Sequence, residues 1–271
     1  MDRYVFFFLL VFSIVAFYSA FDFNDENIPA SKRLTPTYDK SKDESEITNP
    51  DIVITAKQML LVYMDSLEKI FDWEYKTIPY VKFGTPSDMT QRMVNSFDGA
   101  YRPDEKAIYF RDAVDHLIAV QLGTVERNQV TKDRAINFER VSVHELGHFT
   151  HDLFLRNFTS KPLKISNDNA SIDEYIEHTV IGEGIADWAE SQYHQRKWNY
   201  MRADSLPDTI SEEQQIMARD YGIHVVGPIL DVSAREGLKY IVRHPFKIEC
   251  HLFAESVKKY QTEALAFLRN Q

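Results

Sequence analysis

The chain has 271 residues and a formal net charge of −10, with 31 Lys and Arg against 41 Asp and Glu. Its hydrophobic fraction of 44% is typical of a globular protein. The sequence has neither a cluster of Lys and Arg nor a Gly-rich phosphate loop after a strand, so no nucleic-acid partner and no nucleotide chemistry are expected. Cys250 is the only cysteine, which excludes a disulfide within the chain.

The first segment of the chain, residues 1–20, is almost continuously apolar. It is typical of an export signal, with Ser19 and Ala20 as the small residues before a cleavage site. Because the segment approaches the length of a membrane span, an uncleaved N-terminal anchor is the alternative. The sequence thus predicts a secreted or periplasmic protein, or else a membrane-anchored one. Residues 21–50 are polar and charged, which indicates a flexible spacer or short pro-segment before a folded domain over 51–271.

The first part of the expected domain combines helices with short strands. Pro50 opens a predicted helix with a regular apolar face. A strand is predicted over residues 77–83, at a sheet edge because Pro79 has no N–H to donate. Two short strands around a Pro-Asp turn are predicted within residues 96–110, and a helix over 113–122.

The most informative stretch is Val143–His148, VHELGH, which contains a His-Glu-x-x-His motif. It lies in a segment without proline, Asp133–Phe158, whose apolar residues fit helical spacing. Two histidines at this spacing on a helix face the same point, and Glu145 can reach a water bound there. Buried groups of this kind need partners, and a metal ion is the simplest one. His144 and His148 are therefore candidate zinc ligands and Glu145 is a candidate general base; a pair of structural histidines is the alternative.

A third candidate ligand lies downstream. Catalytic zinc usually has three protein ligands and an open position, and two His with one Glu are such a set. Residues 181–188, IGEGIADW, supply Glu183. Asp187, one helical turn later, can accept a hydrogen bond from the far nitrogen of a ligating His. A capping-box pattern at Ser171–Glu174 predicts a helix that continues to Tyr193. The two glycines in IGEGIADW disfavour the helix that is expected here. Such a conflict between local propensity and structure is typical of functional sites, where close approach matters more than propensity. A solvated helical Glu is the alternative for Glu183.

These motifs resemble those of the thermolysin-like gluzincins, zinc peptidases in which His-Glu-x-x-His is followed by Glu-x-x-x-Asp. The resemblance implies that His144, His148 and Glu183 bind Zn²⁺. It implies that Glu145 is the general base and that Asp187 orients a ligating His.

Two further segments are similar to the same family. Residues 221–229, YGIHVVGPI, resemble its Gly-x-His segment, which implies that His224 hydrogen-bonds the oxyanion of the tetrahedral intermediate; a structural histidine is the alternative. Gly99, Ala100 and Tyr101 resemble the edge strand that binds extended substrate by main-chain pairing, and an ordinary hairpin is the alternative.

The expected fold is α+β and zincin-like. A small N-terminal α/β lobe with the edge-strand hairpin and a mostly helical C-terminal lobe would flank the active-site helix, and an amphipathic helix is predicted over Glu249–Leu268. The expected function is that of an exported zinc endopeptidase acting on a peptide or protein substrate. The family's transition-state tyrosine has no counterpart at its usual offset, where Thr159 stands; Tyr175 and Tyr221 are candidate substitutes. Two alternatives stay open. One is a zinc-containing binding or scaffold protein that has lost catalysis, and the other is a zinc hydrolase of a non-peptide amide.

Overall fold

The computed structural model describes residues 50–84, 99–110, 129–163, 177–195, 206–211 and 220–271. All of them lie within one compact unit of the chain, Asp39–Gln271. The other unit, Met1–Tyr38, lies outside the described residues, as does the expected export signal. Among the described helices, none combines the length and the apolar character that crossing a membrane requires.

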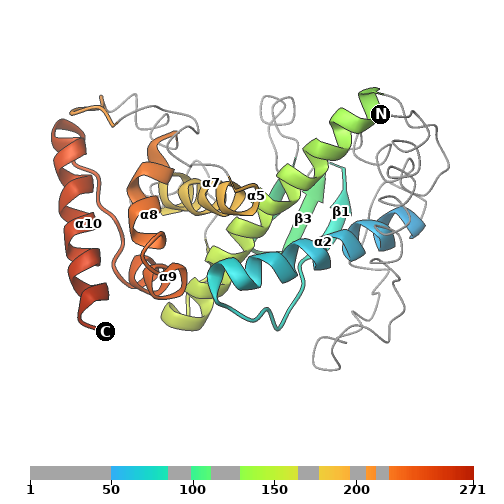
Figure 1. The fold of residues 1–271 in the computed structure, drawn as a ribbon, viewed down its shortest axis with the longest axis horizontal. Helices are drawn as coiled ribbons and strands as arrows, with labels where there is room; N and C mark the ends of the chain where they lie inside the picture. The colour runs from blue at the N-terminus through green and yellow to red at the C-terminus, as the bar shows by residue number, and fades with distance from the viewer. Residues whose placement is uncertain (1–49, 85–98, 111–128, 164–176, 196–205, 212–219) are drawn as a thin grey trace, which may run out of the picture. The chain divides into compact units, whose positions relative to one another are not determined.

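The described part of the chain is mostly helical and contains a small three-stranded sheet (Figure 1). This composition is compatible with the expected α+β class. In chain order the elements are α2 (Pro50–Phe71), β1 (Tyr80–Phe83), β2 (Gly99–Arg102), β3 (Ala107–Phe110), α5 (Gln129–Thr159), the π-helical segment η3 (Glu177–Ile181), α7 (Gly182–Tyr193), α8 (Gly222–Leu230), α9 (Ala234–Arg243), the 3-10 turn η6 (Cys250–Leu252) and α10 (Phe253–Arg269).

The sheet has the strand order β1-β3-β2, so β1 and β2 are its edges. β1 runs parallel to β3, whereas β2 and β3 form the expected antiparallel hairpin, with Tyr101 opposite Ile108. The edge position of β1 agrees with the prediction from Pro79, although the strand begins only at Tyr80. Since β2 is also an edge strand, one side of its backbone has no strand partner among the described residues.

The strongly periodic helices follow their predictions. α2 starts at Pro50 as expected, and its predicted apolar face is buried or packed against the core. α5 contains the whole predicted segment Asp133–Phe158. The C-terminal helix begins with a 3-10 turn and buries the apolar side chains of Phe253, Val257, Tyr260 and Ala264. The helix predicted over residues 113–122 lies outside the described residues.

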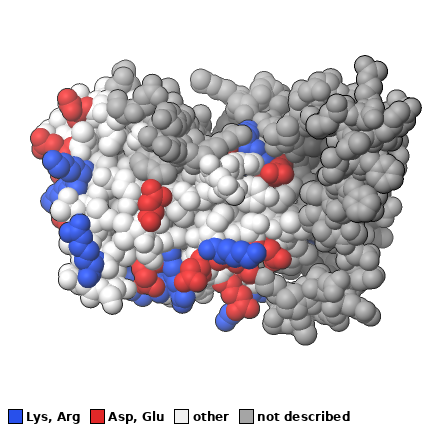
Figure 2. Space-filling model, in the orientation of Figure 1, with Lys and Arg blue, Asp and Glu red and all other residues white. Residues whose placement is uncertain are grey.

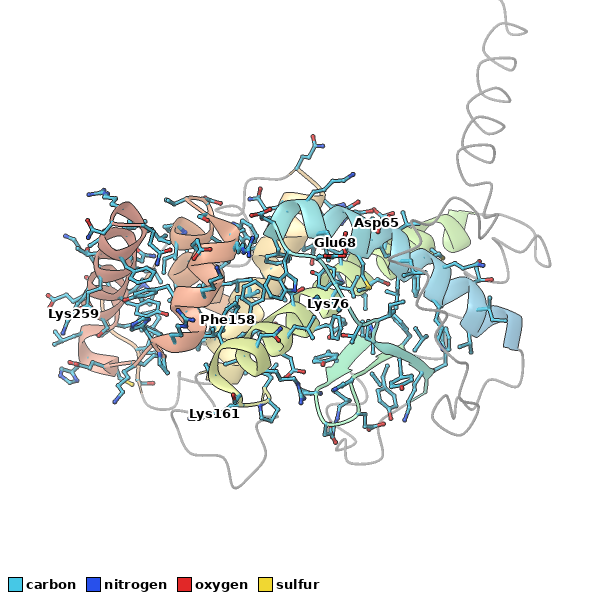
Figure 3. The ribbon with its side chains drawn as sticks, turned by 90° about the horizontal axis from the view of Figure 1, so that it is seen from below. Asp65, Glu68, Lys76, Phe158, Lys161 and Lys259 are labelled. Carbon is cyan, nitrogen blue, oxygen red and sulfur yellow. The ribbon has the colours of Figure 1, made fainter. Side chains whose placement is uncertain are left out.

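The loop after α2 is hydrogen-bonded to both α2 and α5. Glu68, near the end of α2 (Figure 3), accepts a hydrogen bond from the backbone N–H of Tyr75 at 2.9 Å. The hydroxyl oxygen of Tyr75 lies 2.5 Å from Oγ1 of Thr150 on α5, and Thr150 donates to the carbonyl of Leu146 at 2.7 Å. Because Tyr75 and Thr150 are buried, these bonds help to fix α5 relative to α2.

The far end of α5 packs against α9. The ring of Phe158 (Figure 3) has Lys239 Nζ at 5.6 Å and the Arg243 guanidinium at 5.2 Å from its centroid. Lys239 also pairs with Glu236. On the face shown in Figure 2, basic and acidic side chains of the described residues are interspersed and form no single basic stripe.

Glycines allow α5, α7 and α8 to touch through their backbones. A Cβ added to Gly147 of α5 would stand 2.6 Å from Cα of Ala186 on α7. A Cβ added to Gly222 of α8 would stand 2.8 Å from the backbone N of Gly184 on α7 and would overlap the carbonyl oxygen of Val180. The expected close approach at the glycines of IGEGIADW is confirmed at Gly184. These contacts set how closely α7 lies on its two neighbours.

Replacing Gly222 by alanine is expected to destabilise the fold. The added methyl group meets backbone atoms, which cannot move aside as a side chain can, so a loss of about 2–3 kcal/mol in the free energy of unfolding is expected. Urea unfolding measures it. Gly182→Ala is the matched control, because its Cβ would meet nothing nearer than 3.4 Å. Equal urea midpoints for Gly222→Ala and the wild type would show that the α7–α8 contact is looser than described.

Candidate metal centre

The His-Glu-x-x-His motif lies on α5, as its spacing predicts. The rings of His144 and His148 are one turn apart, with their centroids separated by 5.0 Å. Glu183 is in the first turn of α7, which lies across α5 (Figure 1). The close contact between Gly147 and Ala186 brings the two helices together beside these side chains.

Three side chains from α5 and α7 converge on one point. Nε2 of His144 is 3.5 Å from Oε2 of Glu183, and Nε2 of His148 is 3.6 Å from Oε1 of the same carboxylate. The potential ligand atoms all lie within 4.8 Å of one another. A tetrahedral zinc ion with bonds of about 2.0–2.1 Å places its ligand atoms roughly 3.3 Å apart. His144, His148 and Glu183 therefore form a group that could bind a metal ion.

The second nitrogen of His144 faces two carboxylates on α7. Its Nδ1 is 3.3 Å from Oδ1 of Asp187 and 3.6 Å from Oε2 of Glu190. The side chains of both acids are buried, at 2% and 5% exposure. Asp187 thus lies where the sequence places it, whereas Glu190 was not predicted. Arg140 Nη1, 3.8 Å from Glu190, supplies a further positive charge.

The carboxylates around His144 determine its protonation. Burial lowers the pKa of His144, but hydrogen bonds to Asp187, Glu183 and Glu190 outweigh burial and raise that pKa well above its usual value. Without a metal ion, these carboxylates therefore favour the form of His144 that carries a proton on both ring nitrogens. A cation at Nε2 would take the place of one proton, while Nδ1–H stays bonded to a carboxylate. The donor set therefore fits a cation.

Glu145 is a buried carboxyl group close to the metal-binding group but not part of it. Its Oε2 accepts a hydrogen bond from the backbone N–H of Tyr101 on β2 at 2.7 Å. Burial raises the pKa of Glu145 to about 7, although the charge of His144 opposes the increase. A carboxyl group with a pKa near neutrality can both accept and return a proton at neutral pH, as a general base must.

His224 lies on α8, which packs against α7, the helix that carries Glu183. It is in the first turn of α8, just after Gly222, which touches Gly184 next to Glu183. Its side chain is half-buried, and its backbone carbonyl accepts a hydrogen bond from Gln261 Nε2 at 2.6 Å. The structure thus places α8, with His224, beside α7, with Glu183. A contact of His224 with an oxyanion stays a prediction.

The residues of the predicted substrate strand lie on β2, at the edge of the sheet. Gly99 packs so closely on α5 that an added Cβ would overlap the side chain of Val141. Ala100 is half-buried, and the N–H of Tyr101 is bonded to Glu145. That donor is therefore engaged within the chain, and main-chain pairing with a substrate stays a prediction.

Thr159 and Tyr221 both have their contacts within the helical part of the chain. The hydroxyl of Thr159 donates to the carbonyl of Leu155 at 2.6 Å, within its own helix. Tyr221 packs edge-on against Phe253, with ring centroids 5.7 Å apart. Tyr175 lies outside the described residues. The contact of Tyr221 with Phe253 gives no support for a role of Tyr221 in catalysis.

The chain was compared with protein-family models, with curated protein sequences and with solved structures, and none of the three comparisons found a match.

The two carboxylates beside His144 are expected to act as alternative acceptors. One N–H bonds to one carboxylate at a time, so Asp187→Asn or Glu190→Gln alone should weaken zinc binding only slightly. The double variant should weaken it by roughly 10–100-fold, as for other partners of a ligating His. Competition with a fluorescent chelator measures the affinities. If the logarithms of the two single effects add up to the double effect, the carboxylates act independently and this interpretation is wrong.

Proposed function

We propose that the protein is a zinc-dependent endopeptidase. The observation that carries the proposal is the convergence of His144, His148 and Glu183, with the buried carboxyl of Glu145 beside them. The motif order in the sequence, which resembles that of gluzincins, supports it independently. The apolar N-terminal segment supports export from the cell, with an uncleaved membrane anchor as the alternative.

In this proposal His144, His148 and Glu183 would hold the zinc ion. Bound there, zinc supplies Lewis acidity toward the scissile carbonyl and lowers the pKa of a water molecule. Asp187 and Glu190 keep the proton of His144 on Nδ1, which leaves Nε2 as the ligand atom.

Glu145 is the proton carrier of the reaction. It accepts a proton from the attacking water and returns it to the leaving amine. The bond from Tyr101 N–H occupies its Oε2, so that the other carboxylate oxygen is available for the transfer. His224 stabilises the oxyanion, and the edge strand β2 aligns an extended peptide.

A metal-binding protein without catalysis is the second candidate. The observation in its favour is that the hydroxyl of Thr159, at the offset of the missing tyrosine, is bonded within its own helix. A zinc hydrolase acting on a non-peptide amide has no specific observation in its favour.

Digestion of a broad peptide library by the zinc-loaded protein tests the proposal. Cleavage that stops on adding a chelator and returns on adding zinc is the expected result. If a protein with stoichiometric zinc cleaves no member of the library, the non-catalytic candidate is favoured. Hydrolysis of small acylated amides without any cleavage of peptides would favour the other hydrolase.

A further inference from the structure

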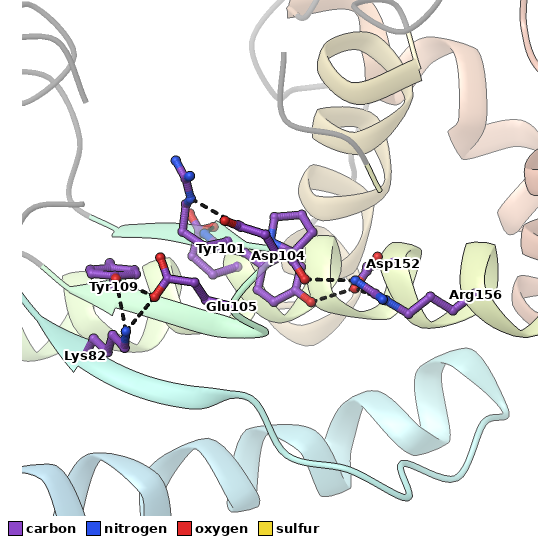
Figure 4. A network of polar contacts seen from close by, with 10 residues as sticks. Lys82, Tyr101, Asp104, Glu105, Tyr109, Asp152 and Arg156 are labelled. Atoms are coloured by element: carbon purple, nitrogen blue, oxygen red, sulfur yellow. Dashed lines mark hydrogen bonds and ion pairs between the residues drawn. The ribbon is translucent and has the colours of Figure 1, made fainter. Parts of the chain in front are cut away.

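A buried carboxylate outside the candidate metal centre ties the edge strand β2 to α5. Asp152 is only 1% exposed. Its Oδ2 accepts hydrogen bonds from the Tyr101 hydroxyl at 2.7 Å and from Arg156 Nε at 2.8 Å (Figure 4), and its Oδ1 accepts one from the N–H of Leu163 at 2.7 Å. Arg156 also donates to the carbonyl of Pro103 in the hairpin turn at 2.8 Å. Charge-assisted bonds of this kind are stronger than those between neutral groups.

Tyr101 is bound to α5 at both of its ends. Its backbone N–H donates to Glu145, and its hydroxyl donates to Asp152. Asp152 follows Glu145 by two helical turns, so the two carboxylates lie on the same face of α5, about 10 Å apart along the axis. The tyrosine side chain therefore spans the distance between them. Burial raises the pKa of the Tyr101 hydroxyl far above its usual value, so the hydroxyl remains a donor at physiological pH.

We propose that Asp152 is a positioning residue for Glu145. By holding the Tyr101 hydroxyl, Asp152 fixes β2 in place along α5 and keeps the Tyr101 N–H on the Glu145 carboxylate. A carboxylate held through one oxygen presents the other in a defined direction, as proton transfer over a short distance requires. The inference rests on the proposed function only for the role of Glu145 as the base.

Two variants weaken the hydrogen bond between the Tyr101 hydroxyl and Asp152 to different extents. Asp152→Asn keeps the size of the side chain, but three donors converge on its two oxygens, so the amide NH₂ must face a donor. Tyr101→Phe removes the hydroxyl alone and leaves the backbone N–H. Asp104→Asn, at an acid that is 61% exposed, and Tyr109→Phe on β3 are the matched controls.

Hydrogen exchange at single amides tests the positioning without measuring activity. In Asp152→Asn and in Tyr101→Phe, the Tyr101 amide should exchange at least about 10-fold faster than in the wild type. The amides of Tyr80 and Gly84, which bond to the carbonyls of Lys106 in the hairpin turn and of Phe110 on β3, should change by less than about 2-fold. The control variants should leave the Tyr101 amide unchanged. An equal increase at all three in the test variants would mean that Asp152 serves global stability alone, and would overturn the proposal.

Turnover of a quenched fluorescent peptide by the zinc-loaded protein is the second readout. Asp152→Asn should lower kcat by about 10-fold, and Asp104→Asn should leave it unchanged. Because Asp152 acts through Glu145, adding Asp152→Asn to Glu145→Gln should cause no further loss. The same loss in both backgrounds would overturn the positioning role. If the wild type cleaves no peptide, the proposed function fails, and hydrogen exchange still decides whether Asp152 holds Tyr101 in place.

Discussion

His148→Ala is expected to abolish stoichiometric zinc binding and, with it, any zinc-dependent hydrolysis. The variant leaves His144 and Glu183 as the only members of the converging group, whereas catalytic zinc sites have three protein ligands. Zinc bound to the folded wild type should also raise its free energy of unfolding, by about 2.7 kcal/mol at a zinc concentration 100 times the dissociation constant. Its melting temperature should rise accordingly. That zinc-dependent increase should disappear in His148→Ala.

Metal content after dialysis, together with melting curves recorded with and without zinc, checks this expectation. His251→Ala is the control, because His251 is an exposed histidine of the turn before α10. The control variant should keep one zinc ion per chain. If His148→Ala also kept one zinc ion per chain, the assignment of the ligands would be wrong.

Glu145→Gln is expected to lower peptide hydrolysis by at least 10²–10⁴-fold, roughly the contribution of general acid–base catalysis, while zinc content and fold persist. Glutamine has nearly the same shape, and its amide oxygen can still accept the hydrogen bond from Tyr101, but it cannot take a proton from water. The loss should therefore appear in kcat, with little change in zinc affinity.

Glu139→Gln makes the same chemical change six residues earlier on α5, at a side chain that is 41% exposed, and should be fully active. Initial rates with one peptide, divided by zinc content, compare the three proteins. Equal rates for Glu145→Gln and the wild type would exclude Glu145 as the base. Zinc binding without hydrolysis in all three proteins would instead favour the non-catalytic candidate.

The parts of the site that follow local rules were predictable from the sequence. Helical spacing is enough to place His144 and His148 on one face of α5, and a second helix was expected to present Glu183 and Asp187. Glu190 continues that series, three residues after Asp187 on the same face of α7. It was missed because the sequence does not show that this part of α7 faces His144.

The link between the sheet and the helix had no local signal. Tyr101 and Asp152 are 51 residues apart in the chain, and no spacing rule connects a strand residue to a helix residue over that distance. The hairpin itself was predictable from its turn residues, but its attachment to α5 depends on tertiary packing. Similarly, the prediction that β1 begins at Thr77 was wrong, because β1 starts only at Tyr80, where pairing with β3 begins.

The backbone contact of Gly147 with Ala186 limits how the candidate metal centre could be adapted to a different cation. Where main chain rests on main chain, exchanging nearby side chains cannot widen or narrow the gap between helices by small steps. The crossing of α5 and α7 then determines the distance between Glu183 and the two histidines. Selection for a larger or harder cation would act through the chemical type of the ligands, for instance carboxylate in place of imidazole, more readily than through repacking around them.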